Sequence, residues 1–206
     1  MVVPAGAPRG RSQTPERILD VALASFGTRG YEATSLDAIA AELGLRKQTI
    51  LYWFPSKEAL LDAVAERSAT ELRDALEAAL AGSEPGFGRL ETVMATVFRF
   101  AVRRPALLGL LREVSRLGPE TADELAARLA PLVHRAIGFL AEEIDAGTIR
   151  RADPRLLLLF IYATVVGVAT ETDVQRAVGL SPSPASLRRL RRELFAYVRA
   201  AVSAGR

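Results

Sequence analysis

The chain has no cysteine and only one histidine, His134, among its 206 residues. The first absence excludes disulfides, thiol-based redox sensing and cysteine-ligated zinc, and the second excludes a metal site built from several histidines. Lysine is also scarce: Lys47 and Lys57 are the only two, so 25 of the 27 basic residues (27 minus 2) are arginines. We therefore expect neither a metal nor any other cofactor.

Long hydrophobic runs are missing as well. The most apolar run, residues 156–169, has 14 residues, which is too short to cross a bilayer and suits a helix buried on most sides. Residues 1–13 lack the apolar core of a signal peptide and are predicted to form a flexible arm. The sequence thus predicts a cytoplasmic globular protein with no membrane partner.

No segment alternates between apolar and polar residues as a strand would, and nearly every segment repeats its apolar residues with helical spacing. The fold class is therefore predicted to be all-α, with about nine helices. Beyond residue 88, helices are expected over about 89–103, 105–117, 119–146, 154–178 and 186–202.

Capping signals divide the N-terminal part into four helices. Thr14 and Pro15 are expected to begin the first helix, and Gly30 to end it. In the second, Thr34 is predicted as the N-cap and Gly44 as the stop. A short third helix follows, and Ser56 is expected to cap a fourth that runs to about residue 80.

The second and third helices, joined at a glycine, match a helix-turn-helix. If Ile50 is at the centre of the inner face of the third helix, Gln48 and Tyr52 lie on the opposite face. Gln48 could then pair with adenine, and Arg46 or Lys47 with guanine. Lys57, in the first turn of the next helix, is placed to hold a phosphate.

The order of these parts is more specific than the helix-turn-helix alone. Residues 30–61 contain Gly30-Tyr31, Thr34-Ser35-Leu36, Ile39-Ala40, Leu43-Gly44-Leu45 and Phe54-Pro55-Ser56-Lys57-Glu58-Ala59-Leu60. This order resembles the N-terminal DNA-binding signature of the tetracycline-repressor (TetR) family of transcriptional regulators. The match covers residues 14–62, while the rest of the chain resembles the family only in length and helical character.

The resemblance implies a helix-turn-helix DNA-binding domain over 14–58 and an effector-binding and dimerisation domain over 59–206. It implies a repressor that binds a palindromic double-stranded operator as a homodimer and is released by a small, largely apolar organic effector. The candidate DNA-contacting residues are Thr34, Ser35, Arg46, Lys47, Gln48, Thr49, Leu51, Tyr52, Trp53 and Lys57.

Three positions of the recognition helix depart from the family pattern. Arg46 replaces a preferred N-cap residue, which weakens the start of the helix by about 1 kcal/mol if nothing else caps it. Gln48 and Leu51 also differ, and Leu51 removes a hydroxyl that relatives commonly direct at DNA. These departures leave the operator sequence open.

The last two helices are candidates for dimerisation. One apolar stripe near the C-terminus and small residues on the preceding helix would allow close packing of two copies; the residues are Leu187, Leu190, Leu194, Tyr197, Val198, Ala163 and Gly167. The alternative is that both helices complete the core of the monomer.

The middle helices are unusually apolar, and in the TetR family such helices enclose an effector cavity. The candidate contacts are Phe98, Leu110, Glu113, His134, Tyr162 and Thr164. His134 shares a face with small residues, so it could point into the space that they leave, although a single histidine on a helix is more often a core or surface residue.

Two other functions remain open at this stage. A small enzyme is poorly supported, because the acidic pairs Glu142-Glu143 and Glu171-x-Asp173 read as solvated helix faces. An all-helical interaction module that does not bind DNA is the second alternative. Salt-sensitive retention on heparin or duplex DNA would distinguish it from a DNA-binding regulator.

Overall fold

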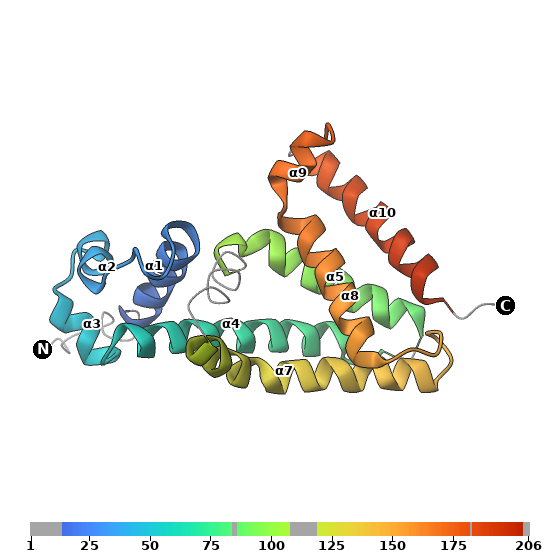
Figure 1. Ribbon diagram of the computed structural model, residues 1–206, viewed down its shortest axis with the longest axis horizontal. Helices are drawn as coiled ribbons and strands as arrows, with labels where there is room; N and C mark the ends of the chain where they lie inside the picture. The colour runs from blue at the N-terminus through green and yellow to red at the C-terminus, as the bar shows by residue number, and fades with distance from the viewer. Residues whose placement is uncertain (1–13, 84–85, 108–118, 182, 204–206) are drawn as a thin grey trace, which may run out of the picture.

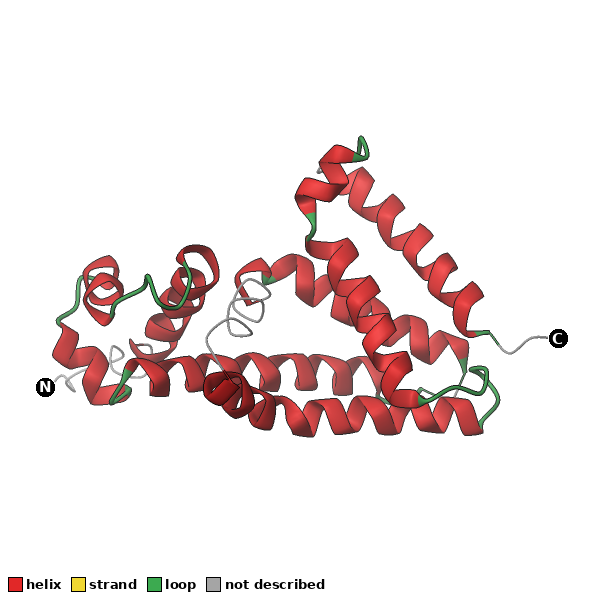
Figure 2. Ribbon diagram, in the orientation of Figure 1, coloured by secondary structure: helices red, strands yellow, loops and turns green. Residues whose placement is uncertain are grey.

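The computed structural model describes residues 14–83, 86–107, 119–181 and 183–203. Within these ranges the regular structure is helical, apart from one isolated bridge between Ile149 and Ser203 (Figure 2). The all-α prediction is confirmed. The helices are α1 (Thr14–Arg29), α2 (Leu36–Leu43), α3 (Lys47–Trp53), α4 (Lys57–Leu80), α5 (Phe87–Arg103), α7 (Pro119–Asp145), α8 (Pro154–Thr170), α9 (Thr172–Ala177) and α10 (Pro184–Val202).

Two hydrophobic cores organise these helices. The first core joins α1, α2, α3 and the start of α4, with Phe26, Ile39, Ile50 and Leu60 fully buried at its centre. The second core joins α5, α7, α8 and α10 through residues such as Met94. In each core, the helices pack against one another through their apolar faces.

Helix α4 extends from the first core into the second half of the molecule (Figure 1). Ser56 caps it as predicted, because its hydroxyl accepts a hydrogen bond of 3.0 Å from the Ala59 N–H. Its first turns pack in the first core, and α4 as a whole also packs against α5 and α7. Helix α4 therefore provides a continuous path by which a conformational change in the second half could reach the first core.

The predicted helix over 154–178 is wrong in one respect, because it is two helices. Glu171 leaves the helical conformation with φ −79° and ψ 65°, which separates α8 from α9. The apolar run ends at Ala169, and β-branched Thr170 and Thr172, which flank Glu171, weaken helix propagation. The predicted helix over 105–117 falls, beyond residue 107, outside the described residues.

The interpretation of Glu143 as a solvated residue is also wrong. Its side chain is fully buried, accepts a 3.0 Å hydrogen bond from the Gly86 N–H and lies 3.2 Å from Nη1 of Arg89. The guanidinium of Arg89 also lies over the Phe139 ring, 4.9 Å from its centroid. A buried carboxylate requires hydrogen-bonding or charged partners to offset its loss of hydration. Here these partners connect the start of α5 to α7.

Candidate nucleic-acid interface

The short helix α3 is held in place by its inner side chains. Ile50 is fully buried in the first core, and Leu51 and Phe54 pack against that core. Gly44 ends α2 with φ 66°, a left-handed conformation that glycine adopts without strain. The glycine turn and the buried Ile50 together fix how α3 is presented to solvent.

The predicted N-cap of α2 is wrong by one residue. Ser35 caps the helix, and its hydroxyl accepts a 3.1 Å hydrogen bond from the Ala38 N–H. Thr34 is buried, and its hydroxyl donates to the Gly30 carbonyl at 2.8 Å. Thr34 is therefore an internal contact within the turn that joins α1 to α2, and the prediction that it contacts DNA is wrong.

The outer face of α3 presents side chains of the kind that read DNA. Gln48 and Tyr52, four residues apart on one helix face, are both exposed, and Tyr52 has 79% of its surface accessible. Trp53 is 41% exposed, and its ring meets that of Tyr52 edge to face at 5.2 Å. Two adjoining exposed aromatic rings form a small apolar patch, and such patches are candidates for binding surfaces.

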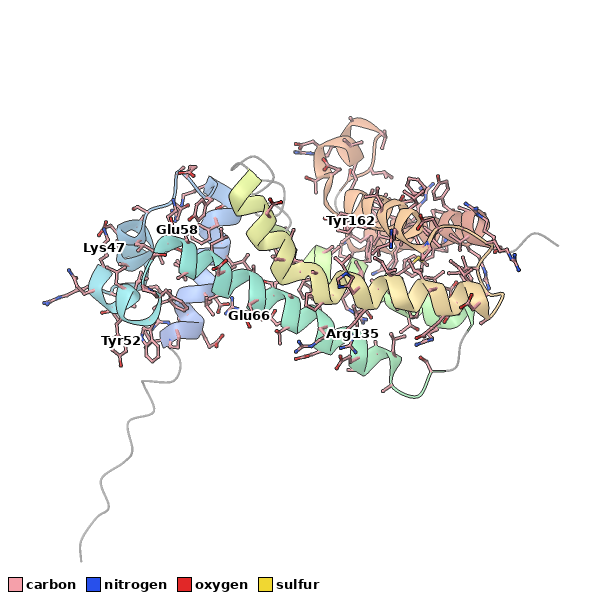
Figure 3. The ribbon with its side chains drawn as sticks, turned by 60° about the horizontal axis from the view of Figure 1, so that its bottom comes forward. Lys47, Tyr52, Glu58, Glu66, Arg135 and Tyr162 are labelled. Atoms are coloured by element: carbon pink, nitrogen blue, oxygen red, sulfur yellow. The ribbon has the colours of Figure 1, made fainter. Side chains whose placement is uncertain are left out.

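The basic residues at the start of α3 differ in their contacts. Lys47 Nζ lies 2.8 Å from Asp37 Oδ2, which ties α3 to the first turn of α2. Arg46 is exposed at the N-cap and makes no capping hydrogen bond, as the sequence predicts. In Figure 3, Lys47 and Tyr52 lie at the same end of the molecule, far from Tyr162. An exposed pair such as Lys47–Asp37 is weak enough for a phosphate to replace Asp37.

Lys57 is partly committed to the fold. Its Nζ lies 3.4 Å from the Glu32 carbonyl and 4.1 Å from the centroid of the Tyr31 ring. The Tyr31 hydroxyl donates to Glu58 at 3.3 Å. Burial raises the pKa of the Tyr31 phenol well above its ordinary value, and the nearby Glu58 carboxylate raises it further. Hydrogen bonds from its own backbone N–H and from Ser56 lower the pKa of Glu58.

The predicted effector contacts do not come together. Phe98 is buried in the second core, whereas His134 and Tyr162 are exposed on α7 and α8. The Thr164 hydroxyl is bound to the Phe160 carbonyl at 2.7 Å. Leu110 and Glu113 lie outside the described residues. The prediction that His134 could point into an internal space is therefore wrong, because its side chain is exposed on α7.

The predicted dimer stripe divides into two sets. Leu194 and Val198 are buried in the monomer's own second core, so their assignment to an interface is wrong. Leu187, Leu190 and Gly167 are half-buried, and Ala163 and Tyr197 are exposed. The prediction that residues 156–169 form a helix buried on most sides is wrong at the start of α8, where three apolar side chains are more than half exposed: Leu156, Leu159 and Phe160.

Nothing in the sequence pattern indicated a chain of charged contacts that joins α1, α4 and α5. Arg67 of α4 lies 3.1 Å from Glu16 and 2.9 Å from Asp20 of α1. Glu71, one turn further along α4, pairs with Arg67 at 3.8 Å and with Arg104 at 2.7 Å. Helical spacing identifies only the contact between residues 67 and 71, because the other partners lie on different helices.

Comparison with known proteins identifies the family of this chain. Residues 18–64, which include α2 and α3, match the family described as "Bacterial regulatory proteins, tetR family". The HTH-type transcriptional regulator RutR of Escherichia coli strain K12 is 30% identical over 160 residues, which are 76% of this chain and 74% of RutR. The chain belongs to the TetR family. It is a transcriptional regulator with a DNA-binding helix-turn-helix, not an enzyme.

Other known proteins are similar to this chain in sequence or in fold. YhgD of Bacillus subtilis strain 168 is 24% identical over 72% of this chain and 80% of its own length. FadR of Bacillus subtilis, solved with stearoyl-CoA, superimposes with a TM-score of 0.75 over 90% of this chain and 97% of FadR, at 20% identity. AibR, solved with isovaleryl coenzyme A and operator DNA, gives 0.72 over 89% and 97%, also at 20%.

A fifth relative was solved with a ligand of opposite charge. A Saccharomonospora viridis protein in complex with choline gives a TM-score of 0.69 over 95% of this chain and all of that chain, at 21% identity. At these identities the solved structures establish the fold of this TetR regulator rather than its ligand. Among the described helices, none is both long and apolar enough to cross a bilayer.

Proposed function

We propose that this TetR-family regulator is a repressor that binds a palindromic operator as a homodimer and is released by a small, largely apolar organic effector. The observation that carries the proposal is the outer face of α3, where Gln48 and Tyr52 are exposed while Ile50 is anchored in the core. The family match supplies the context, and we also propose a cytoplasmic location, where a bacterial operator lies.

The contact residues that we propose on DNA are the accessible members of the predicted set. Gln48 and Tyr52 face outward for bases and backbone, and Arg46 and Lys47 stand at the N-terminal end of α3. Further proposed contacts are Ser35, Thr49, Leu51, Trp53 and Lys57. Phosphate contacts would position the helix, and Gln48 would read a base edge.

For the dimer, we propose a face centred on α8 rather than on the inner stripe of α10. The exposed residues Leu156, Phe160 and Ala163 are spaced four and three apart, so they form one apolar stripe, and the half-buried Gly167 continues it. Tyr197 adds an exposed aromatic ring from α10. In a TetR dimer built this way, the two α3 helices should lie about one duplex turn apart, roughly 34–36 Å.

We propose an organic effector because the chain lacks the residues that sense a metal or an oxidant: it has no cysteine and only one histidine. The complexes of FadR with stearoyl-CoA and of AibR with isovaleryl coenzyme A support the idea that this fold accepts organic ligands. The division into residues 14–58 for DNA binding and 59–206 for effector binding and dimerisation stays a proposal.

A selection of genomic fragments with the purified protein tests this function. We expect the bound fragments to share a palindrome whose half-sites are one or more helical turns apart. Organic compounds that raise the melting temperature should also release the selected fragment. Fragments without a common sequence would contradict the operator, and release by a divalent metal alone would contradict the organic effector.

A further inference from the structure

A groove of about 400 Å³ lies between α4 and α5, and three arginines line it, two from α5 and one from the residue that follows this helix. Arg99 and Arg103 share one face of α5 with Phe100 and the buried Thr96, Arg104 follows the end of α5, and Glu71 of α4 also lines the groove. This volume is within the range of small-molecule sites in proteins. The groove therefore combines a basic wall, one aromatic ring and room for a small ligand.

The charges of the groove are unbalanced. Among the described residues of the lining, three arginines face one carboxylate, a net charge of +2. Arg104 pairs with Glu71 at 2.7 Å. Arg99 is bound only to the Thr96 hydroxyl, at 3.3 Å, and neither Arg99 nor Arg103 has a carboxylate partner within the described ranges. Guanidinium groups that converge in this way are suited to carboxylates and phosphates, which they bind with paired hydrogen bonds.

We propose that this groove binds the oxyanion of the effector, a carboxylate or a phosphate, through Arg99, Arg103 and Arg104. The proposal rests on the proposed function, because it names the chemical class of the effector's polar end. The solved relatives leave this point open, since their ligands are acyl-coenzyme A anions in FadR and AibR but the choline cation in another. The excess of arginine among the described lining residues favours an anion.

The groove also lies where the effector half is joined to the DNA-binding half. Arg104 holds Glu71, Glu71 lies beside Arg67, and Arg67 reaches Glu16 and Asp20 of α1. Two residues after Arg104, the backbone of Ala106 rests against α1 at Gly27. An oxyanion on Arg104 competes with Glu71, and it thereby changes how the end of α5 is held against α1.

The test uses the full-length dimer with octanoate and octyl phosphate as anions and 1-octanol as the neutral probe of equal chain length. By calorimetric titration we expect saturable binding of at least one anion with a Kd of about 1 mM or lower, and no saturation by octanol. The anion that binds more tightly shows whether the groove prefers a carboxylate or a phosphate. The variant R99Q/R103Q should weaken the binding at least about tenfold, since it loses two charge-assisted contacts.

A matched control removes two arginines elsewhere. In R151Q/R188Q the net charge changes equally, but both positions are exposed and lie outside the groove, so anion binding should be unchanged. The variant E71Q should tighten anion binding, because Arg104 is then released from its carboxylate. Equal effects of the two double variants, or no saturation by either anion, would overturn the site, and so would weaker binding to E71Q.

DNA binding is measured separately on the same proteins without anion. If R99Q/R103Q lost DNA affinity while the wild type bound no anion, the arginines would be phosphate contacts and the proposal would be wrong. If the wild type bound no DNA at all, the proposed function would fail. The anion titrations would still show whether the groove binds an oxyanion. The two failures are therefore distinguishable.

Discussion

Gly27 and Ala106 are in direct backbone contact: a Cβ placed on Gly27 would lie 2.0 Å from the Ala106 carbonyl oxygen. This contact seats the chain that follows α5 directly on α1 of the DNA-binding half. A side chain at Gly27 would have to push the two segments apart, because the obstructing atoms belong to the backbone and cannot rotate away. The position therefore reports how tightly the two halves are joined.

We expect Gly27→Ala to lower the free energy of unfolding by about 1–3 kcal/mol, the usual cost of overpacking. Gly138→Ala is the matched control, because Gly138 lies within α7 and a Cβ there would meet nothing within 4 Å. That change should be neutral or stabilising by about 0.5–1 kcal/mol, since alanine favours a helix. Urea unfolding measures the free energy of unfolding of both variants. Equal effects of the two substitutions would show that the Gly27–Ala106 contact does not contribute to stability.

The Tyr31 phenol should make stability decline at alkaline pH. Its folded pKa is raised by burial and by Glu58, so folding favours the neutral phenol. This contribution is complete below about pH 10, where tyrosine ionises in the unfolded chain, and it is lost as the pH rises from there toward the higher folded pKa. The loss should approach about 1.4 kcal/mol per pH unit in that window.

Tyr31→Phe should therefore flatten the dependence of unfolding free energy on pH above about pH 10. Tyr52→Phe serves as the control, because Tyr52 is 79% exposed and its hydroxyl lies outside both cores. Urea unfolding at about pH 9 and about pH 11 measures both slopes. Parallel slopes for the wild type and Tyr31→Phe would contradict the raised pKa.

The two faces of the C-terminal helices should respond differently to a charge. Leu156→Glu with Phe160→Glu places carboxylates on the exposed stripe of α8, so we expect a folded monomer that no longer shifts operator DNA. Leu194→Glu buries a charge in the second core and should instead destabilise the fold by about 3–5 kcal/mol. Light scattering with circular dichroism separates these outcomes, and an unchanged dimer mass for the α8 variant would place the interface elsewhere.

The sequence predicts the N-terminal helices well because their signals are local. Gly44 and Ser56 end and begin helices through their own backbone and hydroxyl groups, and Ile50 is buried where helical spacing places it. Thr34 and Ser35 show the limit of such signals. Either hydroxyl could cap α2, and the choice depends on Gly30, whose carbonyl accepts the Thr34 hydroxyl in the folded structure.

The C-terminal half depends more on contacts between distant residues. Periodicity finds the stripe with Leu194 but cannot show whether it faces the monomer's core or a second copy. In the same way, the sequence does not show that Glu143 rather than Glu142 turns inward, where it accepts a hydrogen bond from the Gly86 N–H, more than 50 residues away. The groove was equally hidden, because spacing places Arg99 and Arg103 on one face of α5 but does not reveal that Glu71 of α4 lines the same groove.

The most direct test of the account compares two DNA contacts that should differ in kind. Gln48→Ala, on the exposed face of α3, should cost about 1–3 kcal/mol on the operator only and leave the salt dependence nearly unchanged. Lys57→Ala should weaken binding to all duplexes and reduce the slope of log affinity against log salt by about 1. The measurement is a salt titration of both variants on operator and random DNA. An equal loss on both duplexes for Gln48→Ala would contradict the claim that α3 reads the operator sequence.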